Sequence, residues 1–289
     1  MKAKILVTGA TGQLGQTIKE FYASDSSYKI LFASKADLDI SDTAAVQNLF
    51  DQHQFEYCIN CAAYTNVEQS EDRPELAFKV NAEAVKNLAG ICEKNNAVLI
   101  HVSTDYVFDG ENKAPYKEID APNPINTYGK SKLQGEQFIQ SSSTKYFIVR
   151  TSWLYSSYGH NFLKTIVNKI QNNESLNITA SQIGTPTSCS TLAQFIFKLI
   201  DSRTPNFGIY HFSDKGQTTW YHFALQICKS FNDYNCDSIQ AINSFKSKAL
   251  RPKYSILDNS KRLRVLQEQP SWEECVDKTV TQLISAPQS

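Results

Sequence analysis

The chain has 289 residues, of which 41% are hydrophobic and 20% are charged, a balance typical of a globular protein. Its 29 basic and 29 acidic side chains cancel, and no run of like charge favours a nucleic-acid or membrane-surface partner. No apolar run approaches the roughly 18 residues that a membrane span needs. The amino terminus does not resemble a secretion signal, so we expect a cytoplasmic protein.

The first half of the chain alternates short apolar segments with amphipathic ones. The apolar segments predict strands at 4–7, 28–32, 57–62, 97–103 and 146–150. The segments between them predict helices at 13–23, 42–50 and 74–94 and from about 127 onward. Ser41 is the expected cap of the second helix, and Asn126 or Thr127 that of the last. Strands that alternate with helices predict βαβ units, and hence an α/β fold with a Rossmann-type, doubly wound parallel sheet.

The second half is less regular. Its spacing predicts a strand at 208–212 and helices at 161–169, 191–200, 219–231 and 272–283. Residues 244–258, which contain Arg251 and Pro252, show no period. We therefore expect a dinucleotide-binding domain at 1–152, with later segments near 176–213 returning to it. A smaller, interleaved substrate-binding lobe is expected at about 153–175 and 214–289.

The cysteines and histidines give little sign of a metal site. The seven cysteines are odd in number, widely spaced and without a secretion signal, which predicts reduced thiols. Cys58 and Cys61 form a CxxC pair, which can bind zinc or carry redox chemistry. Because this pair lies in a predicted buried strand and no second CxxC follows, we favour structural thiols and expect no metal. His101 and His211 fall within predicted strands, which also favours structural roles.

Three glycines, Gly9, Gly12 and Gly15, follow the first predicted strand and open the first predicted helix. A backbone without Cβ atoms can approach a pyrophosphate, and the start of a helix offers unpaired N–H groups. This context is the one that a dinucleotide site requires, although a glycine turn that only permits close packing is the alternative.

The end of the second strand bears on the choice of cofactor. A simple NAD site places an acidic residue there to bind the ribose 2′-hydroxyl. Here the strand ends in Ser34 and Lys35, which can hold a 2′-phosphate, so we favour NADPH. A surface lysine at a strand end is also common, and NADH stays open as the alternative. Asp39 and Ile40 follow and are expected at the edge of the adenine.

Tyr128 and Lys132 are four residues apart, a spacing that places them on one face of a helix. A cation beside a phenol stabilises the phenolate and is expected to lower the pKa of Tyr128. Thr104 ends a predicted buried strand, where α/β proteins place their chemistry. Asn81 lies on the preceding helix and is expected to hold a water behind Lys132. The set predicts a nicotinamide-dependent oxidoreductase that interconverts a carbonyl and an alcohol.

Residues 103–110 (STDYVFDG), with Tyr128 and Lys132, resemble the extended short-chain dehydrogenase/reductase superfamily. Further segments narrow the resemblance to the dTDP-4-dehydrorhamnose reductase family and extend it over nearly the whole chain. These segments are 62–68, 124–136, 150–155, 159–162, 184–187 and 251–252. Two positions depart from the family pattern, because Ser181 and Glu68 stand where that family shows aspartate.

The resemblance implies reduction of the C4 ketone of dTDP-4-dehydro-L-rhamnose to dTDP-L-rhamnose, in nucleotide-sugar biosynthesis. It implies a cofactor bound by Gly12, Gln13, Leu14, Asp39, Ile40, Ala62, Ala63 and Tyr64. It implies a sugar nucleotide bound by Thr104, Asp105, Tyr128 and Trp153. Tyr128 would protonate the developing alkoxide, and Lys132 would stabilise the phenolate and hydrogen-bond the nicotinamide ribose.

Trp153 and Arg251 each have a structural and a functional interpretation. Trp153 follows a strand end, and we favour a wall for the sugar over core packing. Arg251 lies in the irregular segment, and we favour a diphosphate contact over a solvated loop arginine, because arginine binds phosphate in a bidentate manner.

Two other functions stay open. One is a related sugar-nucleotide epimerase or reductase, although a dehydratase would need a second carboxylate where Tyr106 follows Asp105. The other is a non-enzymatic regulatory subunit, of the kind that accompanies methionine adenosyltransferase and resembles this family. A homodimer and a monomer are equally compatible with the sequence.

Overall fold

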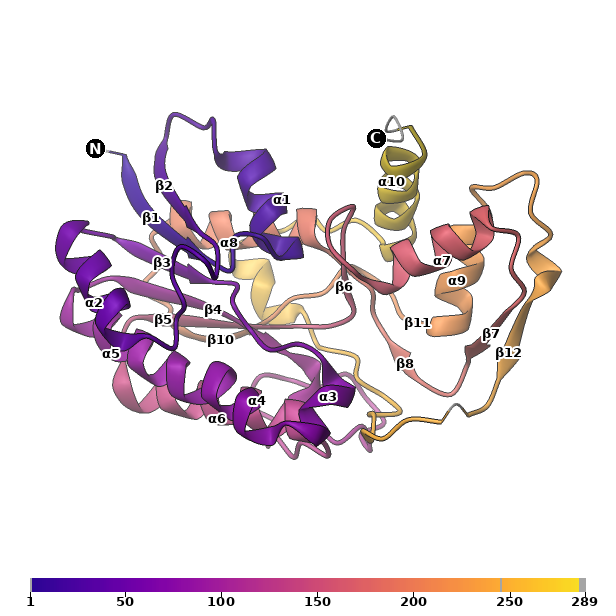
Figure 1. The fold of residues 1–289 in the computed structure, drawn as a ribbon, viewed down its shortest axis with the longest axis horizontal. Helices are drawn as coiled ribbons and strands as arrows, with labels where there is room; N and C mark the ends of the chain where they lie inside the picture. Colours follow the sequence, from indigo (N-terminus) through magenta and orange to yellow (C-terminus); the bar gives the residue numbers. More distant parts are fainter. Residues whose placement is uncertain (1, 245, 286–289) are drawn as a thin grey trace.

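The computed structural model describes residues 2–244 and 246–285 and places a parallel sheet at the centre of the larger lobe (Figure 1). Its strands are β1 (Ala3–Thr8), β2 (Tyr28–Ala33), β3 (Tyr57–Asn60), β4 (Val98–Thr104), β5 (Tyr146–Thr151) and β10 (Gly208–His211). They lie in the order β2-β1-β3-β4-β5-β10, and every neighbouring pair is parallel. The predicted doubly wound sheet is confirmed.

The chain changes direction across the sheet between β1 and β3. From β1 it crosses to β2 on one side, and it then returns to place β3 on the other side of β1. Crossovers that leave in opposite directions open a crevice at the carboxyl ends of those two strands, where α/β proteins bind ligands. The glycine loop after β1 therefore lies at the point where a dinucleotide is expected.

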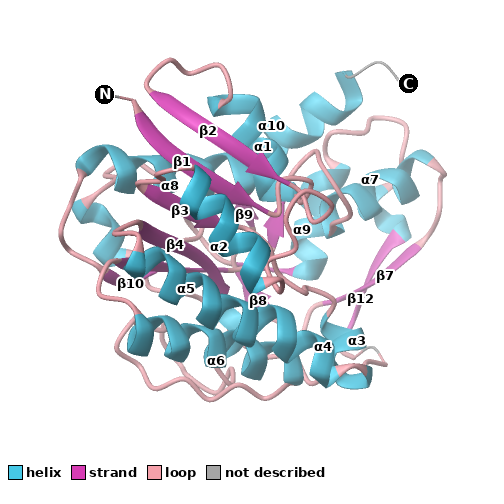
Figure 2. Ribbon diagram, turned by 60° about the vertical axis from the view of Figure 1, so that its left-hand side comes forward, coloured by secondary structure: helices cyan, strands magenta, loops and turns pink. Residues whose placement is uncertain are grey.

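Helices cover both faces of the sheet (Figure 2). One face is covered by α1 (Gln13–Tyr22) and α8 (Cys189–Ser202), and the other by α2 (Thr43–Gln52), α5 (Ala84–Lys94) and α6 (Thr127–Ser142). Successive residues of a strand point to opposite faces, so Ile5 and Val7 pack with α1 and α8 whereas Leu6 packs with α2 and α5. This two-sided burial explains why the strands read as almost continuous apolar runs.

Two predicted helix starts can be compared with the structure. Asn126 caps α6, with its side-chain oxygen 2.7 Å from the Gly129 backbone nitrogen. The prediction of Ser41 as the cap of α2 is wrong, because Asp42 accepts from the Ala45 backbone N–H at 2.9 Å. The Ser41 hydroxyl instead donates to Asp39, two residues earlier in the chain.

The helix predicted at 74–94 is interrupted. It consists of α4 (Pro74–Phe78), the π-helical segment η1 (Lys79–Glu83) and α5, preceded by the unpredicted α3 (Val67–Asp72). The segment η1 carries Asn81, and α6 approaches it so closely that a Cβ on Gly135 would lie 2.2 Å from the Asn81 carbonyl oxygen. Such π segments are frequent at functional sites.

The smaller lobe packs three helices around a separate core. They are α7 (Phe162–Gln171), α9 (Trp220–Cys228) and α10 (Trp272–Ser285). Short strands accompany them: β6 (Leu154–Tyr155), β7 (Leu176–Thr179), β8 (Ile183–Gly184), β9 (Thr187–Ser188), β11 (Thr218–Thr219) and β12 (Ile239–Ile242). The remaining short helical turns are η2 (Asp105–Val107), η3 (Cys236–Ser238) and η4 (Ser260–Arg264). These strands escaped prediction because two to four residues are too few to show a period.

The chain returns to the sheet later than the expected position near residue 176. The strand β7 pairs with β12 in the smaller lobe, and the first element of the return is α8, followed by β10. We keep the division into a sheet domain and a substrate-binding lobe as a proposal, with this boundary moved accordingly. Figure 1 shows the two lobes side by side.

The expectation of reduced thiols is wrong for one pair. Cys228, at the end of α9, and Cys236, at the start of η3, form a disulfide with their Cα atoms 6.0 Å apart. The chain folds back between them, a proximity that spacing alone does not reveal. The cysteines outside this disulfide are Cys58, Cys61, Cys92, Cys189 and Cys275. Within 2–244 and 246–285, no group of His, Cys, Asp and Glu side chains is arranged for a metal ion, and no helix has the length and apolar character of a membrane span.

Candidate active site

The floor of the candidate cofactor site is formed by the loops after β1 and β3. Gly9 has a φ of +65°, and a Cβ there would lie 2.7 Å from the Ala62 backbone nitrogen. A Cβ on Gly15 would lie 2.5 Å from the Gly9 carbonyl oxygen. Gly12 caps α1 without any side-chain hydrogen bond, which leaves the first-turn N–H groups available to an anion. The glycines therefore make a cradle whose shape fits a pyrophosphate.

A cavity of about 340 Å³ adjoins this floor at the ends of β1, β2 and β3. It brings together most of the residues predicted to bind the cofactor. Its lining is Gly9, Thr11, Gly12, Lys35, Leu38, Asp39, Ile40, Cys61, Ala62, Ala63, Tyr64, Leu76 and Val80.

Of the two residues predicted to bind a 2′-phosphate, Lys35 lines this cavity and Ser34 does not. Lys35 lines the cavity, with its Nζ 3.9 Å from an oxygen of Asp39 and its side chain 80% exposed. Ser34 does not line the cavity, and its backbone N–H and hydroxyl both donate to Asp37, at 2.9 and 2.6 Å. Of the two predicted ligands, Lys35 is thus the one in position to meet a 2′-phosphate.

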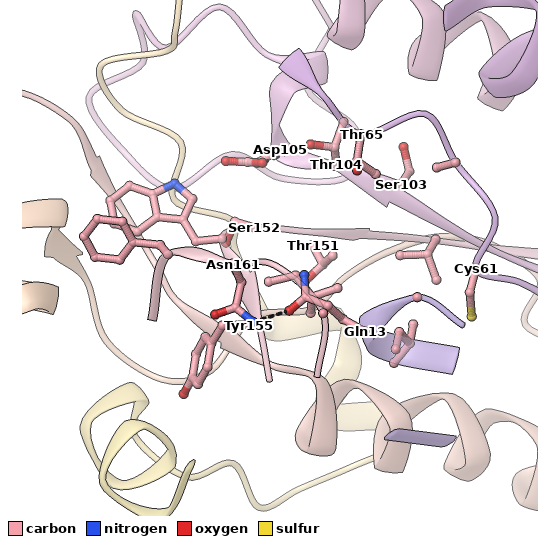
Figure 3. Close-up of a pocket in the computed structure, with 18 of the residues that line it drawn as sticks. Gln13, Cys61, Thr65, Ser103, Thr104, Asp105, Thr151, Ser152, Tyr155 and Asn161 are labelled. Carbon is pink, nitrogen blue, oxygen red and sulfur yellow. Dashed lines mark hydrogen bonds between the residues drawn. The ribbon is translucent and has the colours of Figure 1, made fainter. Parts of the chain in front are cut away.

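A second cavity, of about 510 Å³, lies between the sheet edge and the smaller lobe (Figure 3). The side of this cavity next to the cofactor site is lined by Gln13, Leu14 and Gly15. Its other lining residues include Thr104, Asp105, Tyr128, Lys132 and Trp153, and further residues between 151 and 162. Figure 3 shows Thr104 and Asp105 on one side of this cavity and Gln13 with Asn161 on the other. The sequence-predicted catalytic residues, apart from Asn81, therefore meet in one place.

Thr104 and Tyr128 meet at the end of β4. Thr104 is buried, and its hydroxyl donates to Asp105 at 3.1 Å and accepts from the Tyr106 backbone N–H at 3.2 Å. Burial raises the pKa of Tyr128 above its usual value, while a hydrogen bond with Thr104 acts in the opposite direction. Asp105 and Tyr106 raise it further. Tyr128 is consequently a protonated phenol at neutral pH.

The expectation that Lys132 lowers the pKa of Tyr128 is wrong in this structure. Lys132 is buried, and its Nζ lies 3.0 Å from His101 Nε2 and 2.8 Å from the Val102 carbonyl oxygen. Burial lowers the pKa of Lys132 to about 8, although Glu136 and Cys61 act in the opposite direction. The Nζ of Lys132 is directed to β4 and not to the phenol, so burial determines the direction in which the pKa of Tyr128 moves.

The side chain of Asn81 is hydrogen-bonded to protein groups on two elements. Its Oδ1 accepts from the Tyr64 backbone N–H at 2.8 Å, and its Nδ2 donates to the Tyr64 carbonyl at 2.9 Å and to Ser131 at 3.0 Å. The amide thus joins the cofactor loop to the catalytic helix α6. The sequence placed Asn81 near Lys132 but could not show that its donors were already used.

Asp105 presents an unusual carboxylate to the cavity. It is 2% exposed, and its Oδ2 has no hydrogen-bond partner among the atoms that the structure describes. Burial raises its pKa to about 7, and hydrogen bonds with Ser255 and Thr104 offset only part of this effect. A buried carboxyl oxygen without a partner beside a cavity is suited to a hydroxyl of a bound sugar.

Trp153 forms a wall of the same cavity. Its φ of +44° is left-handed, a conformation that non-glycine residues adopt rarely and often at functional sites. Its ring stacks on Trp220 with centroids 3.7 Å apart, and a Cβ on Gly184 would lie 2.6 Å from it. The ring is thus fixed in place, as the predicted sugar wall requires.

Arg251 lies beside the main cavity, in a neighbouring one of about 400 Å³ that it lines with Phe162, Gln182 and Trp220. It donates to Glu68 at 2.8 Å and to the Tyr106 hydroxyl at 3.2 Å. Burial raises the pKa of Glu68, but hydrogen bonds from Ser247, Arg251 and the 248–249 backbone outweigh it and lower the pKa to about 2. Glu68 therefore fixes the irregular 247–251 segment at the rim of the site.

Some lining residues were not identified from the sequence. Asn161 Nδ2 donates to Gln13 Oε1 at 2.9 Å, and this bond joins the glycine loop to the smaller lobe (Figure 3). Others include Thr65, Ser152, Tyr155, Phe162, Trp220 and Phe223. Several lie in the segments 62–68, 150–155 and 159–162 that carry the family resemblance, but no individual role was predicted for them. Asn161 also caps α7, a signal readable in sequence.

Comparison with known proteins identifies relatives over nearly the whole chain. Residues 3–285 match the family described as RmlD substrate binding domain. A dTDP-4-dehydrorhamnose reductase of Aggregatibacter actinomycetemcomitans is 36% identical over 285 residues, covering 95% of this chain and 97% of that protein. A dTDP-4-keto-6-deoxy-D-glucose reductase of Streptomyces niveus is 34% identical over 265 residues, covering 89% of each. The crystal structure of dTDP-4-dehydrorhamnose reductase from Bacillus anthracis in complex with NADP aligns with a TM-score of 0.92 and 39% identity, over 98% of this chain and 100% of that one.

Proposed function

Because the chain belongs to the RmlD substrate binding domain family, we propose that it reduces the C4 ketone of dTDP-4-dehydro-L-rhamnose with NADPH, giving dTDP-L-rhamnose. The observation that carries this proposal is the meeting of Thr104 and Tyr128 at the wall of a cavity whose opposite side is the glycine loop. A hydride donor on one side and a proton donor on the other are what ketone reduction requires.

The cradle around Gly9 and Ala62 supports a dinucleotide site. The loops after β1 and β3 approach so closely that a Cβ on Gly9 would clash with the Ala62 backbone, and a backbone without Cβ atoms can approach a pyrophosphate. Gly12, Gln13 and Leu14 would hold the phosphates at the start of α1. Lys35, Asp39, Ile40, Ala62, Ala63 and Tyr64 would hold the adenosine half. Bound NADPH supplies the hydride that reaches C4.

The residues of the chain then handle the oxygen of the ketone. Thr104 would hold the oxygen in a hydrogen bond, and Tyr128 would donate the proton that converts the alkoxide to an alcohol. A phenol whose pKa is raised by burial keeps that proton at neutral pH until negative charge develops on the oxygen. Lys132 would bind the nicotinamide ribose and balance the phenolate that remains, while Asn81 positions Tyr64 against α6.

The sugar nucleotide would extend from this oxygen towards the smaller lobe. Trp153 would pack against the sugar ring, and Asp105 would accept from a sugar hydroxyl. Arg251, in the neighbouring cavity, would contact the diphosphate.

The test is the loss of reduced-nicotinamide absorbance with NADPH and substrate generated in place by a dehydratase and an epimerase. We expect oxidation in equal amount to product, and a loss of about 10²–10⁴-fold in turnover for Tyr128→Phe with cofactor binding retained. Tyr210→Phe is a matched control, because it removes a hydroxyl from a buried tyrosine outside both cavities. Near-normal turnover in Tyr128→Phe would exclude it as the acid.

A second candidate is reduction of another dTDP-4-keto-6-deoxy sugar, because the Streptomyces niveus relative is named for such a substrate. Omitting the epimerase from the coupled assay offers the enzyme that unepimerised sugar. Oxidation of NADPH only when the epimerase is present would favour the rhamnose precursor. Conversion of the sugar without net consumption of NADPH would favour an epimerase, and a stable partner without turnover would favour a regulatory subunit.

A further inference from the structure

A row of buried polar side chains crosses the apolar sheet beneath the active site. Parallel register pairs Thr8 of β1 with Asn60 of β3, and Asn60 with His101 of β4. All three are at most 1% exposed. A buried polar group is unfavourable unless it is hydrogen-bonded, so the partners of this row need to be identified.

Each member of the row has a partner, and the row ends at Lys132. Thr8 donates to Asn60 Oδ1 at 2.7 Å, and Asn60 Nδ2 lies 3.0 Å from His101 Nδ1. His101 Nε2 lies 3.0 Å from Lys132 Nζ. Asn60 Oδ1 also accepts from the Ala62 backbone N–H at 3.2 Å, which connects the row to the floor of the cofactor site.

The Ala62 N–H fixes the direction of these bonds. A backbone N–H can only donate, so the oxygen of the Asn60 amide faces Ala62 and its NH₂ group faces His101. His101 Nδ1 is then an acceptor, and the single proton of a neutral imidazole lies on Nε2. Burial holds the pKa of His101 well below its usual value, which keeps the imidazole neutral.

The Nε2–H group therefore points at Lys132 Nζ. An ammonium has three donors and no acceptor, whereas an amine has a lone pair and two donors. The amine accepts from His101 and still donates to the Val102 carbonyl at 2.8 Å, so both contacts of Nζ are hydrogen bonds.

We infer that His101 is a positioning residue for Lys132. It donates a hydrogen bond from its Nε2 to the Nζ of Lys132, holds that side chain against β4 and favours the neutral amine form of Lys132. The relevance of this contact to turnover rests on the proposed function. In that reaction the ammonium form of Lys132 would balance the phenolate of Tyr128, so His101, by favouring the amine, lowers the pH above which that cation is lost.

The other groups around Lys132 oppose His101. Glu136 follows one turn later on α6, and Cys61 approaches from the loop after β3; both favour the ammonium. Glu136 is itself paired with Arg150 of β5 at 2.6 Å, with both side chains 1% exposed. Tyr128 precedes Lys132 by one turn on α6. The pKa of Lys132, lowered to about 8, is consistent with an amine accessible near neutral pH.

The proton position can be measured in the wild-type protein without any substrate. Isotopically labelled histidine gives a nitrogen–proton correlation spectrum in which the two neutral tautomers are distinct, and the His101 signal is assigned by its loss in His101→Phe or, if that variant does not fold, in His101→Gln. We expect a non-titrating Nε2–H tautomer at neutral pH. A proton on Nδ1, or an imidazolium, would overturn the inference whatever the enzyme reduces.

The effect on Lys132 is measured in the pH profile of turnover. Removing the donor in His101→Phe should move the alkaline limb to higher pH by about one unit, since the loss of an ordinary hydrogen bond to the amine shifts a pKa by roughly that much. His211→Phe is the matched control, because His211 is equally buried in β10 and contacts Tyr116 instead. An unmoved limb, or one moved to lower pH, would contradict the inference. Absence of any turnover in the wild type would refute the proposed function but leave the tautomer result standing.

Discussion

Gly9→Ala tests whether the contact between the β1 and β3 loops forms the cofactor floor. The new Cβ would lie 2.7–2.8 Å from Ala62 and Cys61 backbone atoms at a φ of +65°. A left-handed alanine costs about 1–2 kcal/mol, and overpacking of a dense site costs about 1–3 kcal/mol. We expect the free energy of unfolding to fall by about 2–5 kcal/mol in total. Because Ala62 must move, the Kd for NADP⁺ should rise at least about tenfold, or 1.4 kcal/mol.

Denaturant unfolding and a fluorescence titration with NADP⁺ measure these two quantities. Gly90→Ala is the matched control, since its Cβ would meet nothing within 4 Å on the surface of α5. We expect that control to be more stable by about 0.5–1 kcal/mol, because alanine favours a helix interior over glycine, and to bind NADP⁺ unchanged. Wild-type stability and affinity in Gly9→Ala would refute the proposed packing of the floor.

Three further predictions concern buried and rim charges. Arg150→Met should lower the free energy of unfolding by about 3–5 kcal/mol, because it leaves the Glu136 carboxylate buried without its ion-pair partner. Denaturant unfolding measures this loss, and adding Glu136→Leu should restore most of it. If the double variant is not restored, the unpaired charge is not the cause. Asp105 has a folded pKa of about 7, above its unfolded value, so it binds its proton more tightly when folded and its contribution to stability falls as pH rises from about 4 to 7. Asp105→Asn should remove that slope from a plot of Tm against pH, and an unchanged slope would count against the raised pKa. Glu68→Gln should weaken the bond to Arg251 and raise KM for the sugar nucleotide several-fold with kcat nearly unchanged; an equal fall in kcat would place Glu68 in the chemistry instead.

Most of the sheet domain could be predicted from the sequence. The strands are buried on both faces, so β1, β4 and β5 are nearly continuous apolar runs in the sequence. The start of α6 could be predicted from Asn126, which caps it. The glycine loop was identifiable because only a few backbone geometries bring a strand, a tight turn and a helix together. Tyr128 and Lys132 were predictable because helical spacing alone places them on one face.

Other features escaped prediction because they depend on partners distant in the chain. Nothing local to Asn81 reveals that its amide is bound to Tyr64 and Ser131. The sequence gives no sign that Cys228 and Cys236 are paired, because only the turn between them brings the two cysteines together. His101 resembled an ordinary strand residue, although strand register places it between Asn60 and Lys132.

The sequence by itself determined the α/β class and singled out the candidate cofactor loop and the candidate catalytic pair. These follow from periods of two and 3.6 residues and from short-range backbone geometry, which are local properties of the chain. Only the tertiary structure decided the ionisation of the site: the phenol stays protonated, Lys132 is turned to His101, and Asp105 lacks a partner for one oxygen. Ionisation depends on burial and on charges brought together from separate elements, and both are set by packing.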